Sequence, residues 1–258
     1  MNKPEAASSG LSRRKFLTAG AATAAGVTVA PGISLLSVAH AKPVGQAVSD
    51  EQRWGMLIDT NKCAKGCSAC VDACNTENGL NTGDEQQSRP EQKAQWIRKV
   101  DLRDKLTGHE VSLPLMCQHC ENPPCVDVCP TGASFKREDG VVLVDKHICI
   151  GCRYCMMACP YKARSFIHEE LTHQVENVPR GKGTVESCTL CVHRIDEDTN
   201  NQRDPACAEA CNTEGHKAMV FGDLKDSNST VSKELKKHSS KAIREDLGLN
   251  PGIRYRGI

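Results

Sequence analysis

Aromatic residues are scarce in this sequence: phenylalanine, tryptophan and tyrosine together make up only 3% of its 258 residues. Because such side chains supply much of the buried area of ordinary cores, a conventional apolar core would be thin here. The formal net charge is only +1, so no strongly basic surface for nucleic acid is expected. Beyond residue 41 no stretch approaches the ~18 apolar residues of a membrane-spanning helix. We therefore predict that the mature chain reaches a membrane only through partners.

Several motifs of common redox proteins and enzymes are also missing. No Cys-x2-Cys-His motif occurs, which excludes covalently attached c-type haem on motif grounds. The sequence shows no glycine-rich phosphate loop, no Ser-His-Asp arrangement and no paired carboxylates for acid–base catalysis. It therefore predicts no catalytic residue and no substrate chemistry of its own.

Cysteine, in contrast, is abundant, and its sixteen copies form four quartets. In chain order these are Cys63, Cys67, Cys70 and Cys74; Cys117, Cys120, Cys125 and Cys129; Cys149, Cys152, Cys155 and Cys159; and Cys188, Cys191, Cys207 and Cys211. The second and third quartets end in Cys-x3-Cys-Pro, the spacing with which bacterial ferredoxins hold a pair of [4Fe–4S] clusters. Metal ligation also supplies folding free energy, which compensates for a thin core.

The geometry of a [4Fe–4S] cubane explains this spacing. Each of the four irons needs one thiolate, and the loop from Cys149 through Cys152 to Cys155 can wrap three of them. Cys159 has already entered a helix and points at the neighbouring cluster instead, so the fourth cysteine of each quartet is expected to cross over.

Zinc ions and disulfide bonds are the alternatives for these cysteines. A structural zinc ion would be satisfied by Cys-x2-Cys pairs and gains nothing from the third and fourth cysteines at these offsets. Sixteen is an even number, and export would permit disulfides. However, a disulfide framework would show scattered spacings rather than quartets, so iron–sulfur clusters are favoured.

The first and fourth quartets depart from the commoner spacing. Three residues separate Cys63 from Cys67, and fifteen separate Cys191 from Cys207. Alone, the fourth quartet would indicate a zinc ribbon, but beside three cluster quartets it is more naturally the split partner of the first. Four clusters are then expected on these sets: Cys63, Cys67, Cys70 and Cys211; Cys74, Cys188, Cys191 and Cys207; Cys117, Cys120, Cys125 and Cys159; Cys129, Cys149, Cys152 and Cys155.

The predicted fold is α+β, with two ferredoxin-like units related by a pseudo-twofold axis, one contiguous and one split. The expected segments are 42–110, the first part of the split unit; 111–168, the contiguous unit; 169–222, an insertion loop and the second part of the split unit; and 223–258, a helix and an extended tail. Expected strands are 54–58, 140–144 and 218–221, with a hairpin of 96–100 and 110–113. Helical turns are expected between Val231 and Leu247, and the tail after them is a candidate to wrap a partner.

Residues 1–41 are similar to a signal for export by the twin-arginine (Tat) pathway. Ser12-Arg13-Arg14-Lys15-Phe16-Leu17 matches the consensus, and Ala39-His40-Ala41 fits a signal-peptidase site with cleavage after Ala41. The alternative is an uncleaved membrane anchor, but glycines and a proline interrupt the intervening run. We therefore predict a periplasmic protein that is exported folded, with its clusters already bound.

Other residues near the cluster loops have two interpretations each. Lys65, Arg153 and Lys162 would raise cluster potentials by favouring the more negative reduced cluster, or they are solvated surface charges. Three histidines are expected to hydrogen-bond sulfur or to be exposed, because four thiolates already complete each cluster: His119, His147 and His193.

The four quartets resemble those of a known family, the four-cluster ferredoxin subunits of respiratory complexes. Examples are the iron–sulfur subunits of tetrathionate, polysulfide and dimethyl-sulfoxide reductases and of the formate-dependent nitrite reductase system. The segment Cys117–Cys125 and the block Phe221–Asp226 are typical of this family, and the resemblance covers roughly residues 53–235. It implies an electron-transfer subunit with four [4Fe–4S] clusters.

Within that family the leader, the Cys63–Cys70 loop and the tail Leu247–Tyr255 most resemble the sulfite-reductase-associated electron-transfer subunits. This implies an extracytoplasmic subunit of a quinone-linked membrane complex of dissimilatory sulfur metabolism. Its partners would be a polytopic quinone-interacting membrane subunit and a multihaem cytochrome c or another redox subunit. The alternative is the electron-transfer subunit of a molybdopterin reductase, or of a nitrite reductase system. The sequence does not record the direction of electron flow.

Overall fold

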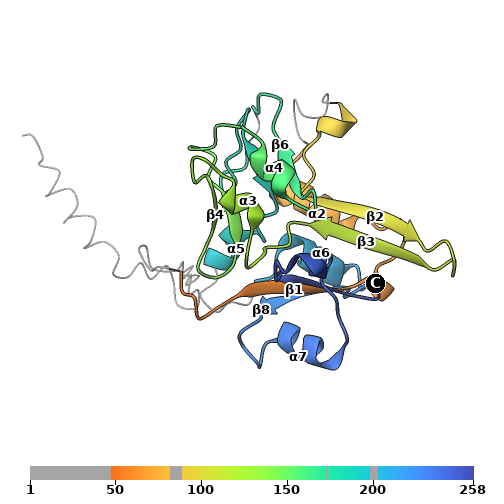
Figure 1. Ribbon diagram of the computed structural model, residues 1–258. Coiled ribbons are helices and arrows are strands. Elements are labelled where there is room, and N and C mark those ends of the chain that lie inside the picture. Colours follow the sequence, from red (N-terminus) through yellow and green to blue (C-terminus); the bar gives the residue numbers. More distant parts are fainter. Residues whose placement is uncertain (1–47, 82–88, 173, 198–202) are drawn as a thin grey trace, which may run out of the picture. The chain divides into compact units, whose positions relative to one another are not determined.

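The structure, a computed structural model, describes residues 48–81, 89–172, 174–197 and 203–258. The expected leader and its cleavage site lie outside these residues. Within them, no helix is both long and apolar enough to cross a membrane. Small sheets and short helices share the described chain, which agrees with a ferredoxin-like α+β fold (Figure 1).

The largest sheet has three strands in the order β8-β1-β9. β1 (Trp54–Asp59) pairs antiparallel with β8 (Met219–Asp223) and parallel with β9 (Ile253–Arg256). All six residues of β1 are buried, as expected for an apolar run in a central strand. The strands expected at 54–58 and 218–221 are therefore confirmed.

The extended C-terminal tail packs inside the chain's own sheet, which corrects the expectation that it wraps a partner. Ile253 and Tyr255 are both 0% exposed beside β1. Gly55 on β1 makes this close approach possible, because a Cβ there would collide with the carbonyl oxygen of Gly252. Pairing between strands at opposite ends of the chain depends on tertiary packing and leaves no local signal in the sequence.

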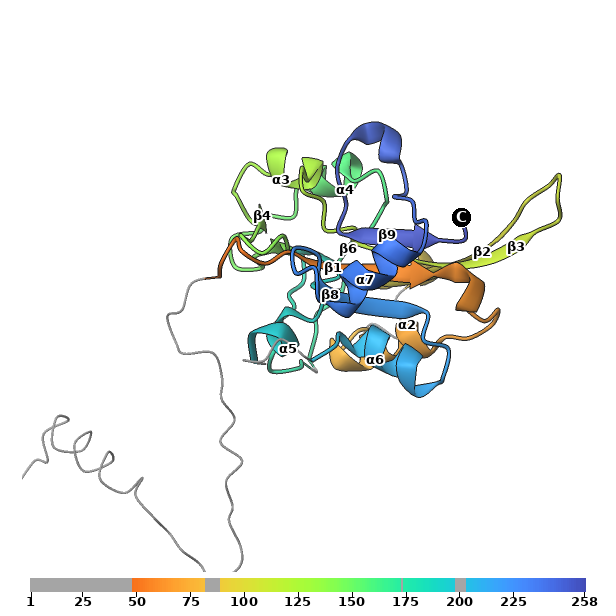
Figure 2. The same ribbon diagram turned by 90° about the horizontal axis from the view of Figure 1, so that it is seen from below.

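The hairpin expected in the first third of the chain is present and longer than expected. β2 (Ile97–Arg103) pairs antiparallel with β3 (Glu110–Met116) over the full length of both strands. Figure 2 shows this hairpin extending past the end of β1. Leu106, in the turn, is 98% exposed.

Two smaller hairpins and two short helices surround the second and third quartets. The paired strands are β4 (Ser134–Lys136) with β5 (Val142–Val144) and β6 (Arg164–Phe166) with β7 (Val185–Ser187), and the helices are α3 (Pro124–Asp127) and α4 (Tyr154–Ala158). The two helices pack against each other. The strand expected within residues 140–144 is present as β5.

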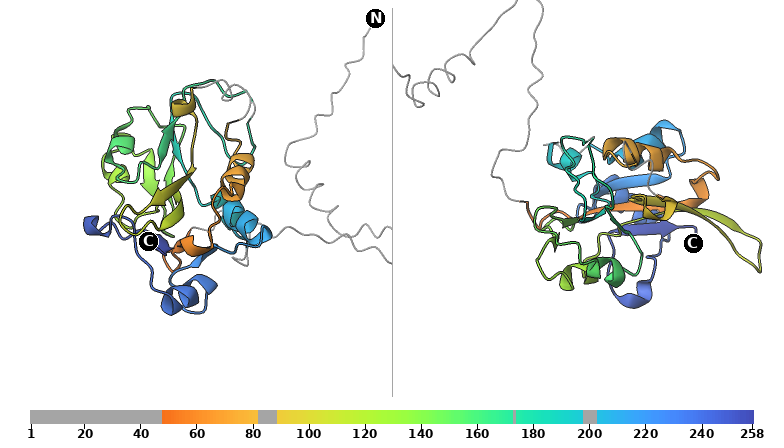
Figure 3. Two further views of the ribbon diagram at one scale, coloured as in Figure 1. Left: turned by 90° about the vertical axis from the view of Figure 1, so that its right-hand side faces the viewer. Right: turned by 90° about the horizontal axis from the view of Figure 1, so that it is seen from above.

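Two helices that are far apart in the sequence pack side by side (Figure 3). α2 (Ala69–Glu77) follows the loop of the first quartet, and α6 (Ala206–Thr213) carries the last two cysteines. α5 (Val192–Glu197) follows the first two cysteines of the fourth quartet. Two short 3-10 helices complete this part of the chain, η1 (Thr60–Lys62) and η3 (Pro90–Gln92).

The helix expected near the C-terminus is present as α7 (Thr230–Lys237), but it does not reach Leu247. The backbone groups of Lys241 instead exchange hydrogen bonds of 2.7 and 2.8 Å with those of Tyr255. This pairing with β9 fixes the chain in an extended form and ends the helix. Leu247 lies in a separate 3-10 helix, η4 (Glu245–Leu247).

The hydroxyl of Tyr255 offers a test of the docked tail. It donates to the carbonyl oxygen of Pro114 (3.1 Å) and accepts from the side-chain amide of Gln118 (3.0 Å). Tyr255→Phe leaves these buried groups without that partner, which should destabilise the protein by about 1–3 kcal/mol. Melting temperature, followed by near-UV circular dichroism on cluster-loaded protein, should fall by about 2–4 °C per kcal/mol.

Tyr154→Phe is the matched control, because Tyr154 is 56% exposed. Removing its hydroxyl should leave the melting temperature unchanged. If Tyr255→Phe melts together with this control, the tail is not docked as the structure shows.

Candidate iron–sulfur sites

All sixteen cysteines are free, and most lie in the interior. Eleven are buried, four are half-buried, and Cys152 is exposed. Loops carry the first cysteines of each quartet, and short helices carry the later ones. The cysteines therefore occupy positions that large apolar side chains fill in an ordinary core.

Four cysteines from two different quartets line one cavity: Cys117, Cys120, Cys125 and Cys159. Most of the remaining wall is apolar and includes Pro123, Val142 and Ala163. Cys159 reaches the cavity because the chain leaves the helical conformation there, at the end of α4. The cavity thus joins the last cysteine of the third quartet to the first three of the second.

The other cysteines of these two quartets also approach one another. Burial raises the pKa of the Cys155 thiol, and the nearby thiolates of Cys129 and Cys149 act in the same direction. Cys152 lies between Cys149 and Cys155, in the loop that leads into α4. The last cysteine of the second quartet is therefore brought to the first three of the third.

Helices α2 and α6 bring the first quartet to the fourth. Cys70 and Cys74 are four residues apart on α2, and Cys207 and Cys211 are four residues apart on α6. Residues at this spacing share one face of a helix, one turn apart. Two helices packed against each other can therefore supply two thiols to each of two neighbouring groups.

The electrostatic influence of the thiols on one another agrees with two such groups. Burial, together with the thiolates of Cys63, Cys211 and Cys67, raises the pKa of Cys70 to about 11. Burial also raises the pKa of Cys207 well above its ordinary value, and the thiolates of Cys188, Cys191, Cys74 and Cys70 act in the same direction.

Hydrogen-bond donors face sulfur in all four groups. The donors are the N–H groups of Ser134 to Cys129 (3.3 Å), Val185 to Cys149 (3.5 Å), Leu190 to Cys188 (3.4 Å) and Ala218 to Cys211 (3.3 Å), with the side chains of Asn78 to Cys74 (3.6 Å) and Arg164 to Cys125 (3.1 Å). Such bonds favour the anionic thiolate. They also raise the reduction potential of a cluster that the thiolates hold.

Comparison with known proteins gives the family. Models of the 4Fe-4S dicluster domain match residues 62–133 and residues 109–224. Iron–sulfur subunit 1 of the Hdr-like menaquinol oxidoreductase of Archaeoglobus fulgidus is 42% identical in an alignment of 268 positions that covers 95% of this chain and 97% of that protein. The chain belongs to the ferredoxin-like iron–sulfur subunits.

Other relatives of this iron–sulfur subunit come from different respiratory systems. One subunit of the tetrathionate reductase of Salmonella typhimurium is 36% identical, with 88% of this chain and 83% of that protein covered. Protein NrfC of Escherichia coli is also 36% identical, with 94% of this chain and 93% of that protein covered. The family resemblance inferred from the quartets is thereby confirmed at the level of the iron–sulfur subunit.

Two dicluster domains give the iron–sulfur subunit four [4Fe–4S] clusters. The cavity lined by Cys117 and three other cysteines fits such a cluster, because soft thiolates are the ligands that iron–sulfur clusters select. The Nη1 group of Arg164, which lines the same cavity, is buried without a hydrogen-bond partner in the described chain. That donor is free to meet a sulfide of the cluster.

The basic residues singled out in the sequence lie at the surface or against other groups. Lys65 forms an exposed ion pair with Glu110 (2.8 Å), and Lys162 is exposed. The guanidinium of Arg153 lies 3.7 Å from the centre of the Phe166 ring. For Lys65 and Lys162 the solvated-charge interpretation therefore fits the structure better.

Two other basic residues approach the cysteines, and the sequence analysis missed both. Lys99, on β2, donates to the carbonyl oxygens of Ala64 (2.5 Å) and Cys67 (2.6 Å) in the loop of the first quartet. Arg164, the first residue of β6, is buried. Its place five residues after the cluster cysteine Cys159 was the one sequence signal for Arg164, whereas Lys99 had none.

The histidines divide between two structural roles. His119 is 1% exposed, and its Nδ1 accepts a hydrogen bond from the N–H of Val142 (3.0 Å). Burial lowers the pKa of His119 to about 3, so its ring is neutral. His119 therefore supports the backbone through Nδ1 and is not exposed, whereas its buried Nε2 has no hydrogen-bond partner in the described chain, so a bond to cluster sulfur stays a prediction. His193 lies 2.7 Å from a carboxylate oxygen of Glu77.

Ion pairs hold the cysteine-bearing helices together. Arg194 on α5 binds Glu77 on α2 with two hydrogen bonds of 2.6 and 2.5 Å and also pairs with Glu209 on α6. Arg194, followed by His193, lowers the pKa of Glu77 to about 2. A lowered pKa stabilises the fold above the ordinary value of 4.5, and this contribution is lost as the pH falls from there towards 2.

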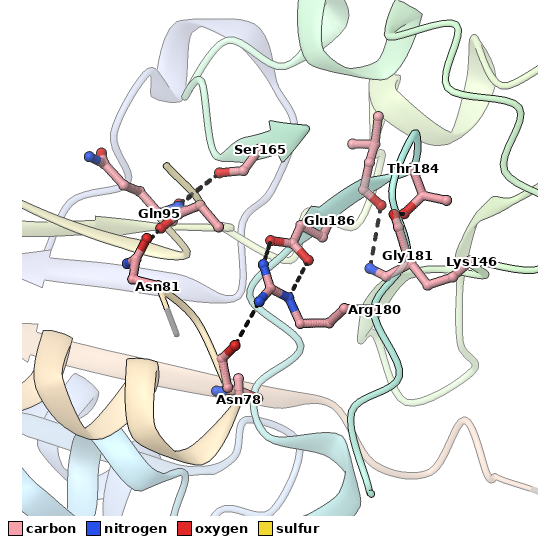
Figure 4. A network of polar contacts seen from close by, with 12 residues as sticks. Asn78, Asn81, Gln95, Lys146, Ser165, Arg180, Gly181, Thr184 and Glu186 are labelled. Atoms are coloured by element: carbon pink, nitrogen blue, oxygen red, sulfur yellow. Dashed lines mark hydrogen bonds and ion pairs between the residues drawn. The ribbon is translucent and has the colours of Figure 1, made fainter. Parts of the chain in front are cut away.

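A second ion pair is buried where the segment after α2 meets β7 (Figure 4). Arg180 donates to both carboxylate oxygens of Glu186 on β7, at 2.9 and 2.8 Å, and to the carbonyl oxygen of Gly79 after α2 (2.6 Å). Glu186 is 0% exposed. Arg180 thus joins the end of α2 to β7. Removing one partner of such a buried pair is strongly destabilising.

Proposed function

We propose that this iron–sulfur subunit carries single electrons through its four [4Fe–4S] clusters between the redox partners of a quinone-linked membrane complex. The interleaving of the cysteines carries the proposal. Cys70 and Cys74 on α2 belong to different groups, as do Cys125 and Cys129 at α3. One helical turn thus separates the ligands of two clusters, and close neighbours of this kind are what stepwise electron transfer requires.

We assign one cluster to each cysteine group. Cluster A takes Cys117, Cys120, Cys125 and Cys159; cluster B takes Cys129, Cys149, Cys152 and Cys155; cluster C takes Cys63, Cys67, Cys70 and Cys211; cluster D takes Cys74, Cys188, Cys191 and Cys207. The cavity lined by the cluster A set supports the first assignment. The thiolates that surround Cys155, Cys70 and Cys207 support the others.

Clusters A and B then belong to a contiguous unit, and clusters C and D to a split unit related to it by a pseudo-twofold axis. The corresponding helix pairs support this arrangement. α3 packs against α4 in the first pair, and α2 packs against α6 in the second. In the second pair each helix carries two cysteines four residues apart, whereas in the first pair the second cysteine, Cys129 or Cys159, lies just past the end of its helix.

The proposed partners are a polytopic quinone-interacting membrane subunit and a multihaem cytochrome c, in a complex of dissimilatory sulfur metabolism like that of the sulfite-reductase-associated protein DsrO. The 42% identity to a subunit named for menaquinol oxidation supports the quinone link. The alternative is a subunit that serves a molybdopterin reductase, favoured by the 36% identity to the tetrathionate reductase protein.

We further propose a periplasmic location, reached through the Tat pathway with cleavage after Ala41. The support is the pair Arg13-Arg14 followed by a weakly apolar run. Export in the folded state suits a protein whose clusters are inserted before it leaves the cytoplasm.

Reciprocal serine variants test the ligand assignment. Cys159→Ser should alter the same electron paramagnetic resonance signal as Cys120→Ser, because both residues hold cluster A. Cys129→Ser should alter the same signal as Cys152→Ser, because both hold cluster B. Loss of one cluster would lower iron from about sixteen to about twelve atoms per chain. If Cys159→Ser instead matches Cys152→Ser, each quartet closes on its own cluster and the assignment is wrong.

Purification of the tagged chain from native membranes tests the function itself. We expect a quinone-interacting membrane subunit and a multihaem cytochrome c to co-purify, and quinol to reduce the cytochrome in that complex. A molybdopterin subunit in their place would overturn this proposal in favour of the alternative. Cys152→Ser should stop reduction of the cytochrome, and continued reduction without cluster B would contradict a linear path.

Variants of the leader test the proposed export. Arg13→Lys combined with Arg14→Lys should leave the precursor in the cytoplasm with its clusters intact, since the Tat route requires the arginine pair. Cell fractionation with iron analysis of the retained protein measures this. Lys3→Gln, outside the motif, is the control and should be exported normally. Normal export of the double variant would show that the motif has been misread.

A further inference from the structure

Arg164 is a buried cation with an unusual set of partners. The residue is 6% exposed, and its Nη2 donates to the sulfur of Cys125 (3.1 Å) and to the hydroxyl of Ser134 (2.8 Å). No carboxylate pairs with it among the residues that the structure describes. A buried charge without a counterion is strongly unfavourable, so its counterions must be the cysteine thiolates and the clusters that they hold.

These contacts reach two different cysteine groups. Cys125 belongs to the cluster A set, and Arg164 itself lines the cavity of that set. Ser134 leads to the cluster B set, because its backbone N–H donates to the sulfur of Cys129 (3.3 Å).

A position between two anionic groups has a direct electrostatic consequence. A cluster with four thiolates is anionic and becomes more negative when it gains an electron. A nearby cation therefore favours the reduced state of either cluster and raises both reduction potentials. Because the site is buried, water screens this interaction less than it would at the surface.

Lys99 supplies the comparison within the same chain. Its ammonium donates to the carbonyl oxygens of Ala64 and Cys67 in the loop of the first quartet. Cys67 belongs to the cluster C set. Lys99 therefore faces one cluster, whereas Arg164 faces two.

We propose that Arg164 is an electrostatic bridge between clusters A and B, a positioning residue that raises the reduction potentials of both and eases electron transfer between them. The proposal rests on the ligand assignment given under the proposed function. Arg164 binds Cys125 directly and reaches cluster B through Ser134, whose N–H donates to the sulfur of Cys129. One side chain thereby sets the reduction potentials of two neighbouring clusters on the electron path.

Redox titration of the anaerobically purified full chain tests the bridge. The signals of clusters A and B are first identified as those lost in Cys120→Ser and Cys152→Ser. Arg164→Gln should then lower both midpoint potentials while the other two stay unchanged. We expect each oxidised-to-reduced ratio at fixed potential to rise at least tenfold, which is about 59 mV for one electron. Iron should remain at about sixteen atoms per chain.

Two further variants separate charge from structure. Lys99→Gln is the matched control and should lower the potential of a single cluster, which is neither A nor B. Arg164→Lys keeps the charge but places it farther from Cys125. Both midpoint potentials should therefore fall less, so that each oxidised-to-reduced ratio at fixed potential rises by less than tenfold. Should Arg164→Gln fail to assemble its clusters, this lysine variant decides the question.

The possible outcomes distinguish failure of the bridge from failure of the ligand assignment on which it rests. If either Arg164 variant retains four clusters and shifts only one potential, or none, the bridge is wrong while the assignment stands. If the reciprocal serine variants show that quartets close on their own clusters, the assignment fails whatever the potentials do. A paired shift of A and B in Arg164→Gln, with C and D unmoved, supports the bridge.

Discussion

Thiolate ligation of iron is the interaction on which this fold depends. Sixteen thiols must converge in groups of four, and eleven of them are buried in places where a core would otherwise hold large side chains. The aromatic content of 3% is compatible with a stable fold because cluster binding supplies folding free energy. The small sheets and short helices are then best understood as supports that hold cysteine loops at fixed positions.

Helix pairs convert this requirement into an arrangement of sites. Cysteines four residues apart lie on one face of α2 and of α6, so two packed helices serve two neighbouring groups at once. The ion pairs of Arg194 with Glu77 and of Arg180 with Glu186 hold these helices to each other and to β7. Because such pairs are buried or half-buried, they fix relative positions more than they add net stability.

Electrostatics within the chain are arranged around anionic sites. Lys99 and Arg164 direct their charges inwards, towards cysteine loops, and Lys146 donates to the carbonyl oxygen of Val185, whose N–H donates to the sulfur of Cys149. Peptide N–H groups add further donors to sulfur. All ligands being cysteine, differences in potential between clusters must come from these surroundings rather than from ligand type.

The sequence by itself determined the chemistry and the local elements. Quartet spacing indicated four clusters, and apolar runs located β1, β5 and β8, because ligand spacing and strand pattern are both local properties. Only the tertiary structure decided that the tail becomes β9 and that His119 is buried and accepts a hydrogen bond from Val142. It alone placed Lys99 and Arg164 beside cysteine loops. These contacts join residues distant in the chain, and a buried cation is recognisable only once its anionic neighbours are known.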